Sequence, residues 1–130
     1  MENKLVLTVI TDVAKISNNM FKKTEYLTTD PFWENGERLL ISAALAYMLT
    51  EFSEEDRTLS NLRNLVNMAV IDGEQEISDS KFATMIEDLK NKKPEHMGIT
   101  YFEGVRMTSP RTYRAIVASA VSRIDTLIAA

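Results

Sequence analysis

The stretch that decides the fold is Asp30-Pro31-Phe32-Trp33-Glu34, which is soon followed by an apolar run at residues 39–52. Asp30 can accept hydrogen bonds from free backbone N–H groups at a helix start, and Pro31 suits the first helical position, where no N–H is needed. Glu34 adds negative charge to the first turn, which the helix dipole favours. The stretch therefore predicts a helix start. Trp33 is the only tryptophan, and we expect it to be buried, so that Trp33→Ala costs roughly 3–5 kcal/mol.

The helix that begins here is predicted to span about residues 31–52 and to be the hub of the domain. A helix without a wide polar face is covered by neighbours on several sides. This segment is apolar on nearly all sides, through Leu39, Leu40, Ile41, Ala43, Ala44, Leu45, Ala46, Tyr47, Met48 and Leu49. We therefore expect the other helices to pack around it.

Five further segments have apolar residues at helical spacing, at about residues 6–23, 62–69, 82–89, 97–105 and 113–128. Hydroxyl side chains that can cap a helix precede three of them. We expect Ser60 to cap the second segment, Ser78 or Ser80 the third, and Ser109, with Pro110, the last.

The pattern is weakest in two places. Residues 5–9 are also compatible with a strand, and Gly98 and Gly104 weaken the prediction of a helix at 97–105. Elsewhere we find no strand-like alternation, internal repeat or low-complexity segment. The sequence therefore predicts an all-α fold, a compact bundle of about six helices around the buried central helix.

Length and composition indicate one domain. The chain has 130 residues, 45% of them hydrophobic, which is enough for a single core. It has no cysteine, which excludes disulfides and thiolate chemistry and fits a reducing compartment. No apolar run reaches the roughly 18 residues that a membrane span needs. We expect a single all-alpha domain over residues 1–130, located in the cytoplasm and without membrane contact of its own.

The charge balance argues against tight, autonomous binding of DNA. The net charge is −4, whereas neutralisation of phosphates supplies most of the affinity of DNA-binding proteins. Acidic residues gather at 51–56 and 72–79. Basic residues also gather locally, and the candidates for contacting DNA or a partner are Lys90, Lys92, Lys93, Arg111 and Arg114. The competing interpretation is that these runs are solvated helix ends and loops.

No motif indicates catalysis or a cofactor. His96 is the only histidine and cannot build a typical zinc site without cysteines, so we expect it at the surface or at a helix start. There is no Gly-x-x-x-x-Gly-Lys-Ser/Thr phosphate loop and no Gly-x-Ser-x-Gly elbow. Asp72-Gly73-Glu74 predicts a turn, because the remaining ligands of a calcium loop are not in register. We predict no enzyme activity, no metal and no cofactor for this chain.

The opening stretch, together with Glu37 and residues 39–47, resembles a motif of conjugative coupling proteins. These are the TraG/TraD-type ATPases of type IV secretion systems, especially their Gram-positive branch. The resemblance continues in the same order at residues 12–17, 62–69, 82–89, 94–96 and 109–123, and so covers about residues 10–125. The chain departs from the family pattern at Ser109-Pro110, where the family often has Ala-Gly or a similar small pair.

The resemblance implies an all-alpha domain, which in that family is inserted between the Walker A and Walker B motifs of a RecA-like motor. Met1 would then be an artificial start, and ATP hydrolysis would belong to a membrane-anchored parent protein. The implied function is a substrate-recognition module that docks the relaxase or accessory proteins with their DNA for transfer. The implied partners are relaxase or relaxosome accessory proteins, the remainder of the parent ATPase and, weakly, DNA.

Two other functions are compatible with the sequence. The domain could be a structural cap of the motor ring that transmits its motions, or a stand-alone helical interaction protein unrelated to conjugation. Within the coupling-protein hypothesis, the negative net charge favours protein docking over DNA binding. Exposed residues of the acidic loops and the loops beside the last helix are the expected docking sites.

Overall fold

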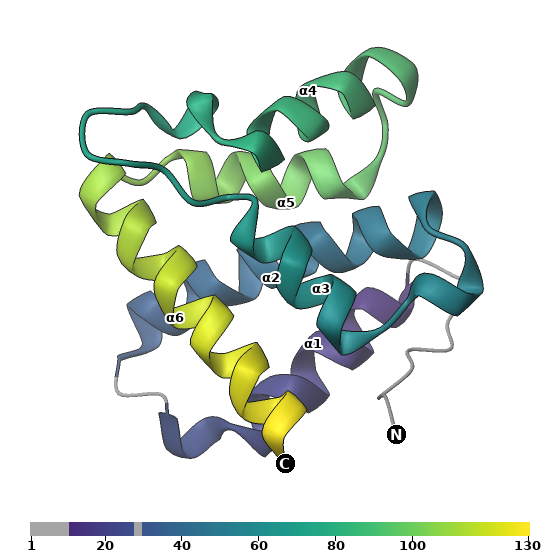
Figure 1. Ribbon diagram of the computed structural model, residues 1–130, viewed down its shortest axis with the longest axis vertical. Coiled ribbons are helices and arrows are strands. Elements are labelled where there is room, and N and C mark those ends of the chain that lie inside the picture. Colours follow the sequence, from purple (N-terminus) through teal and green to yellow (C-terminus); the bar gives the residue numbers. More distant parts are fainter. Residues whose placement is uncertain (1–10, 28–29) are drawn as a thin grey trace.

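The structure is a computed structural model that describes residues 11–27 and 30–130, and this part of the chain is all-α (Figure 1). It contains six α-helices and three short 3-10 turns, and the all-α prediction is confirmed. The helices are α1 (Thr11–Lys23), α2 (Pro31–Glu51), α3 (Leu59–Asn67), α4 (Lys81–Lys92), α5 (Met97–Arg106) and α6 (Pro110–Ala129), and the 3-10 turns are η1 (Glu25–Leu27), η2 (Glu54–Asp56) and η3 (Ile77–Asp79). Residues 6–10 of the first expected helix, and the alternative strand at 5–9, lie outside the described residues.

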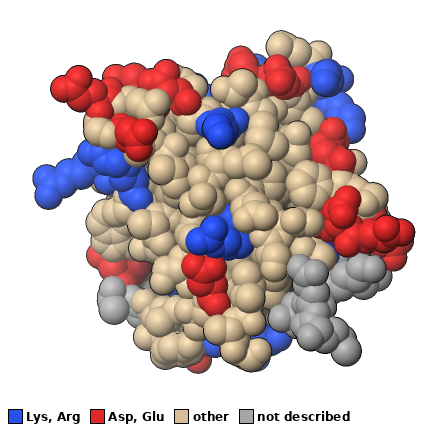
Figure 2. Space-filling view, viewed as in Figure 1, with Lys and Arg blue, Asp and Glu red and all other residues tan. Residues whose placement is uncertain are grey.

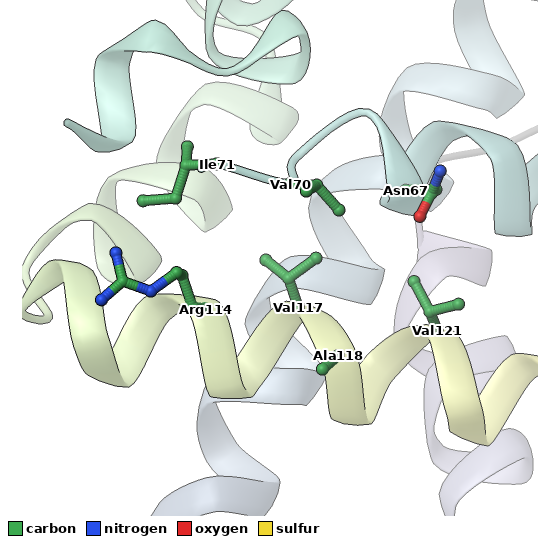
Figure 3. A pocket seen from close by; sticks show the side chains of 7 residues that line it. All are labelled: Asn67, Val70, Ile71, Arg114, Val117, Ala118 and Val121. Carbon is green, nitrogen blue, oxygen red and sulfur yellow. The ribbon is translucent and has the colours of Figure 1, made fainter. Parts of the chain in front are cut away.

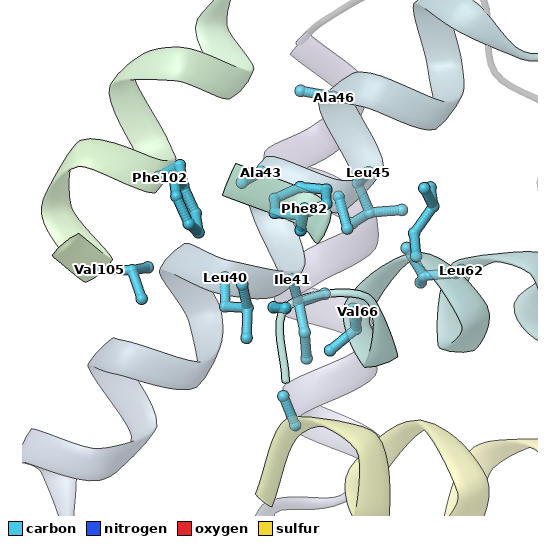
Figure 4. Packing of buried hydrophobic residues seen from close by; sticks show 14 of the residues in the cluster. Leu40, Ile41, Ala43, Leu45, Ala46, Leu62, Val66, Phe82, Phe102 and Val105 are labelled. Atoms are coloured by element: carbon cyan, nitrogen blue, oxygen red, sulfur yellow. The ribbon is translucent and has the colours of Figure 1, made fainter. Parts of the chain in front are cut away.

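Helix α2 is the hub, as its sequence predicts, because it packs against α1, α3, α5 and α6. In Figure 1, α3 and α6 lie in front of α2, while α4 and α5 lie above it. Leu40, Ile41 and Leu45 of α2 are fully buried. Figure 4 shows Leu40 and Ile41 between Val105 of α5 and Val66 of α3, with Leu45 farther along α2 beside Phe82 of α4, which places the core along the length of α2.

A chain of four aromatic rings links the helices around the core. Phe82 of α4 lies between Tyr47 of α2 and Phe102 of α5, at centroid distances of 6.4 and 5.3 Å. Tyr113 of α6 follows, 6.5 Å from Phe102. All three contacts are edge-on, the arrangement that the quadrupoles of aromatic rings favour.

Hydroxyl and carboxylate caps begin the helices where the sequence places them, with one exception. The Asp30 carboxylate accepts a hydrogen bond from the Phe32 N–H at 2.9 Å, and Ser80 and Ser109 cap α4 and α6. Ser60, however, is not the cap of α3. Thr58 is, because its Oγ1 accepts the Asn61 N–H at 3.1 Å while Leu59 already enters the core.

Trp33 packs against the core but is only partly buried, so the expectation of a buried indole is met only in part. Its ring contacts Phe32 edge-on at 5.5 Å, and Phe32 is itself 60% exposed. The last residues of α6 also differ from expectation. Ile128 belongs to the predicted apolar stripe but is 38% exposed, because the helix extends beyond the core there.

Glycines allow close packing of α2 against α5 and α6. A Cβ at Gly104 of α5 would lie 2.9 Å from Leu39 Cδ1, and one at Gly36 would overlap the Ile116 side chain of α6. Gly98 and Gly104 therefore do not interrupt α5, because tertiary contact outweighs their low helix propensity. None of the helices in the described ranges is long and apolar enough to cross a membrane.

Candidate functional site

The five basic residues singled out in the sequence fall into two separate groups. Lys90, Lys92 and Lys93 lie at the carboxyl end of α4, and Arg111 and Arg114 lie in the first turns of α6. These two helix ends lie on opposite sides of the molecule in Figure 1. The fold therefore does not bring the five residues into one patch.

Lys93 is engaged within the domain. Its Nζ donates to Glu51 Oε2 at 2.6 Å and links the end of α4 to the end of α2. The hydrogen bond from Lys93 lowers the pKa of the Glu51 carboxyl. Lys90, Lys92 and Arg111 are exposed, and Arg114 is half-buried.

A groove lies between the end of α3 and the middle of α6, with a volume of about 380 Å³. Figure 3 shows its two walls, one from α3 and the segment after it and the other from α6. The first wall consists of Asn67, Val70 and Ile71, and the second of Arg114, Val117, Ala118 and Val121. Among the described residues, Arg114 is the only charged one that lines it.

The wall after α3 is held by a hydrogen bond from α6. The Tyr113 hydroxyl donates to the Ala69 carbonyl oxygen at 2.6 Å, and both residues are buried. Burial raises the pKa of Tyr113 to about 12, so the hydroxyl remains a donor at neutral pH. Ile71 then turns inward, whereas Val70 stays 47% exposed toward the groove.

Polar contacts lie near both ends of the groove. At one end Arg114 Nη1 donates to the Gly73 carbonyl oxygen at 3.1 Å. At the other end, one helical turn beyond Asn67 and Val121, Arg63 Nε contacts Asp125 Oδ1 at 3.0 Å. Figure 2 shows that most charged side chains lie at the margins of this face, while a few basic side chains and an acidic one lie nearer its middle, surrounded by uncharged surface.

A buried ion pair lies between α6 and α2, and the sequence interpretation missed it. Arg123 is 2% exposed, and its Nε contacts Glu37 Oε1 at 3.0 Å. Its Nη1 donates to the Thr24 carbonyl oxygen at 3.0 Å and to Thr24 Oγ1 at 2.7 Å. The Phe21 ring lies between two guanidinium groups, with Arg123 at 4.3 Å and Arg38 at 4.4 Å from its centroid. In the sequence, the one local sign of this ion pair is that an arginine directly precedes Ile124, which is buried.

His96 is at a helix start, as expected, but it is not at the surface. It is 8% exposed and caps α5, where its Nδ1 accepts the Gly98 N–H at 2.9 Å. Its Nε2 lies 2.6 Å from Thr50 Oγ1. Since Nδ1 accepts, a neutral ring carries its proton on Nε2 and donates it to Thr50. Burial lowers the pKa of His96, which favours this neutral form.

Comparisons with protein-family models, with curated proteins and with solved structures found no match for this chain. Among residues 11–27 and 30–130, no group of three or more His, Asp and Glu side chains is arranged to hold a metal.

Proposed function

We propose that this chain is a protein-docking module that binds its partner in the groove between α3 and α6. The groove itself is the observation that carries the proposal. Its walls are mainly Val, Ile and Ala, and one of them, Val70, is 47% exposed. Apolar surface that remains exposed on a folded domain is a common feature of protein interaction sites.

The arrangement of charge favours a protein partner over nucleic acid. DNA binding needs several cations along one surface, because each neutralised phosphate releases counterions. Here the candidate cations form two groups at distant helix ends, Lys93 is paired with Glu51, and the net charge is −4. DNA contact is therefore proposed only as a weak addition to protein docking.

The finer form of the proposal is a substrate-recognition module of a conjugative coupling protein. It is supported by the resemblance of residues 10–125 to the all-alpha domain of that family. In this form the partner is a relaxase or a relaxosome accessory protein, and the domain lies in the cytoplasm beside the motor of its parent ATPase. The proposal assigns binding to this chain and leaves ATP hydrolysis to the parent.

The test is a titration of the purified chain with a purified relaxase and, separately, with its DNA. Ala118→Arg places a long cation in the groove, and Ala115→Arg is the matched control, since residue 115 is exposed on the same helix but does not line the groove. We expect relaxase binding to weaken about tenfold or more with Ala118→Arg, a change of about 1.4 kcal/mol, and to persist with Ala115→Arg.

Two results would count against the proposal in different ways. If relaxase binds wild type and Ala118→Arg equally, the groove is not the docking site. If only DNA binds, and binding weakens when the lysines of α4 are neutralised, the basic residues carry the function instead.

A further inference from the structure

The groove has the length of two helical turns. Its α6 wall runs from Arg114 to Val121, a span of seven steps of about 1.5 Å each, or about 10 Å. A second helix lying along this wall would place side chains at positions i, i+3 or i+4, and i+7 over the same distance. The dimensions therefore fit the apolar face of a short helix.

The chemistry of the walls also selects a helical occupant. An extended peptide that binds by strand addition pairs its backbone N–H and C=O groups with the edge of a sheet in its receptor. The described part of the chain has no strand, and five of the seven side chains that line the groove are hydrocarbon. A helix satisfies its backbone internally and needs only apolar contact from these walls.

Arg114 determines the charge that the occupant must carry at one end. Its only hydrogen bond within the described residues is the one to the Gly73 carbonyl oxygen, and none of their carboxylates pairs with it. A guanidinium has five N–H donors, so most of them remain for a ligand. Asp72 and Glu74 flank Gly73 and are exposed, and they would repel a run of acidic residues. One carboxylate fits this end, and an acidic stretch does not.

We propose that the groove takes an amphipathic helix of a partner protein, with apolar residues at i, i+3 or i+4, and i+7 and a single Asp or Glu that pairs with Arg114. This inference rests on the proposed docking function and specifies its ligand. The half-burial of Arg114 supports it, because a guanidinium held at the edge of an apolar groove is suited to a directed ion pair.

The test uses a displayed library of peptides about 15 residues long, the length at which isolated helices become marginally stable. The library is selected on the wild-type protein, and peptides that also bind Ala118→Arg are removed. We expect the remaining peptides to share helical apolar spacing and one carboxylate at a fixed position. Selection on Arg114→Glu should replace that carboxylate with Lys or Arg, and Arg111→Ala, an exposed neighbour outside the groove, should leave it unchanged.

Affinities of the selected peptides complete the test. We expect Arg114→Ala to weaken binding about tenfold and replacement of the peptide carboxylate by an amide to weaken it equally, with no further loss when both are combined. Peptides that require the groove but lack helical spacing or the carboxylate would overturn this inference and leave the docking function standing. If no peptide distinguishes wild type from Ala118→Arg, the docking function fails and the inference fails with it.

Discussion

The buried ion pair between Arg123 and Glu37 allows a prediction whose magnitude follows from the structure. Both side chains are almost fully buried, so Arg123→Met leaves the Glu37 carboxylate without its counterion in the interior. Removing one partner of a buried pair costs about 3–5 kcal/mol. Folding free energies are typically about 5–15 kcal/mol, so this single change removes a large part of the stability.

Replacing both partners should be less harmful than replacing one. The double variant Glu37→Met/Arg123→Met buries no charge, and Met approximates the length of both side chains. The double variant still loses the other contacts of Arg123, which include its position over the Phe21 ring and its hydrogen bonds to Thr24, whose buried carbonyl then costs about 1–3 kcal/mol. We therefore expect the double variant to be more stable than Arg123→Met alone by roughly 1–3 kcal/mol.

The assay is urea unfolding followed by helical circular dichroism, with Arg63→Met as the control. Arg63 and Asp125 form an ion pair whose side chains are 38% and 50% exposed, so its loss should cost less than about 1 kcal/mol. The reasoning is refuted if Arg123→Met costs no more than Arg63→Met. It is equally refuted if the double variant is no more stable than Arg123→Met, because the loss of stability would then come from altered packing of the side chains and not from an unpaired charge.

Three further changes probe other contacts. Because burial lowers the pKa of His96, this histidine takes up its proton at a higher pH in the unfolded chain than in the folded one. The free energy of unfolding should therefore be highest above about pH 6.5 and fall below it by at most about 1.4 kcal/mol per pH unit. His96→Asn keeps a capping acceptor and should flatten this part of a series of urea-unfolding measurements at different pH. Tyr113→Phe leaves the buried Ala69 carbonyl unpaired and should cost about 1–3 kcal/mol in urea unfolding, whereas a cost near zero would mean that this hydrogen bond does not hold the groove wall. Trp33→Ala should cost about 1–2 kcal/mol, below the roughly 3–5 of a fully buried aromatic, and the wild-type fluorescence maximum should lie between those of buried and exposed indoles.

The sequence predicts the helix starts well because capping is a local interaction. Asp30, Ser80 and Ser109 each bond to an N–H only two or three residues away, so a short window contains the whole signal. Where two hydroxyl residues could each cap the same helix, the local sequence does not determine which of them does. Thr58 caps α3 in place of Ser60 because Leu59 is drawn into the core, which is a tertiary effect.

The candidate groove could not be predicted from local patterns because it depends on contacts between distant parts of the chain. The hydrogen bond that places its first wall joins Tyr113 to Ala69, 44 residues away. The ion pair that links α6 to α2 joins Arg123 to Glu37, 86 residues away. Of the five basic candidates, only Arg114 lines the groove, and nothing in the sequence separates it from its neighbour Arg111.

These two contacts also connect the walls of the groove to the rest of the domain. Arg123 holds α6 against α2, and Tyr113 holds the segment after α3 against α6, so each wall is held from outside the groove. A groove that is already formed in the free protein binds its ligand more tightly, because less conformational entropy is lost on binding. Arg123→Met should therefore weaken both stability and peptide affinity, whereas Ala118→Arg should weaken affinity alone. If the double variant Glu37→Met/Arg123→Met recovers peptide affinity to the same extent as it recovers folding stability, the ion pair affects peptide binding by positioning α6.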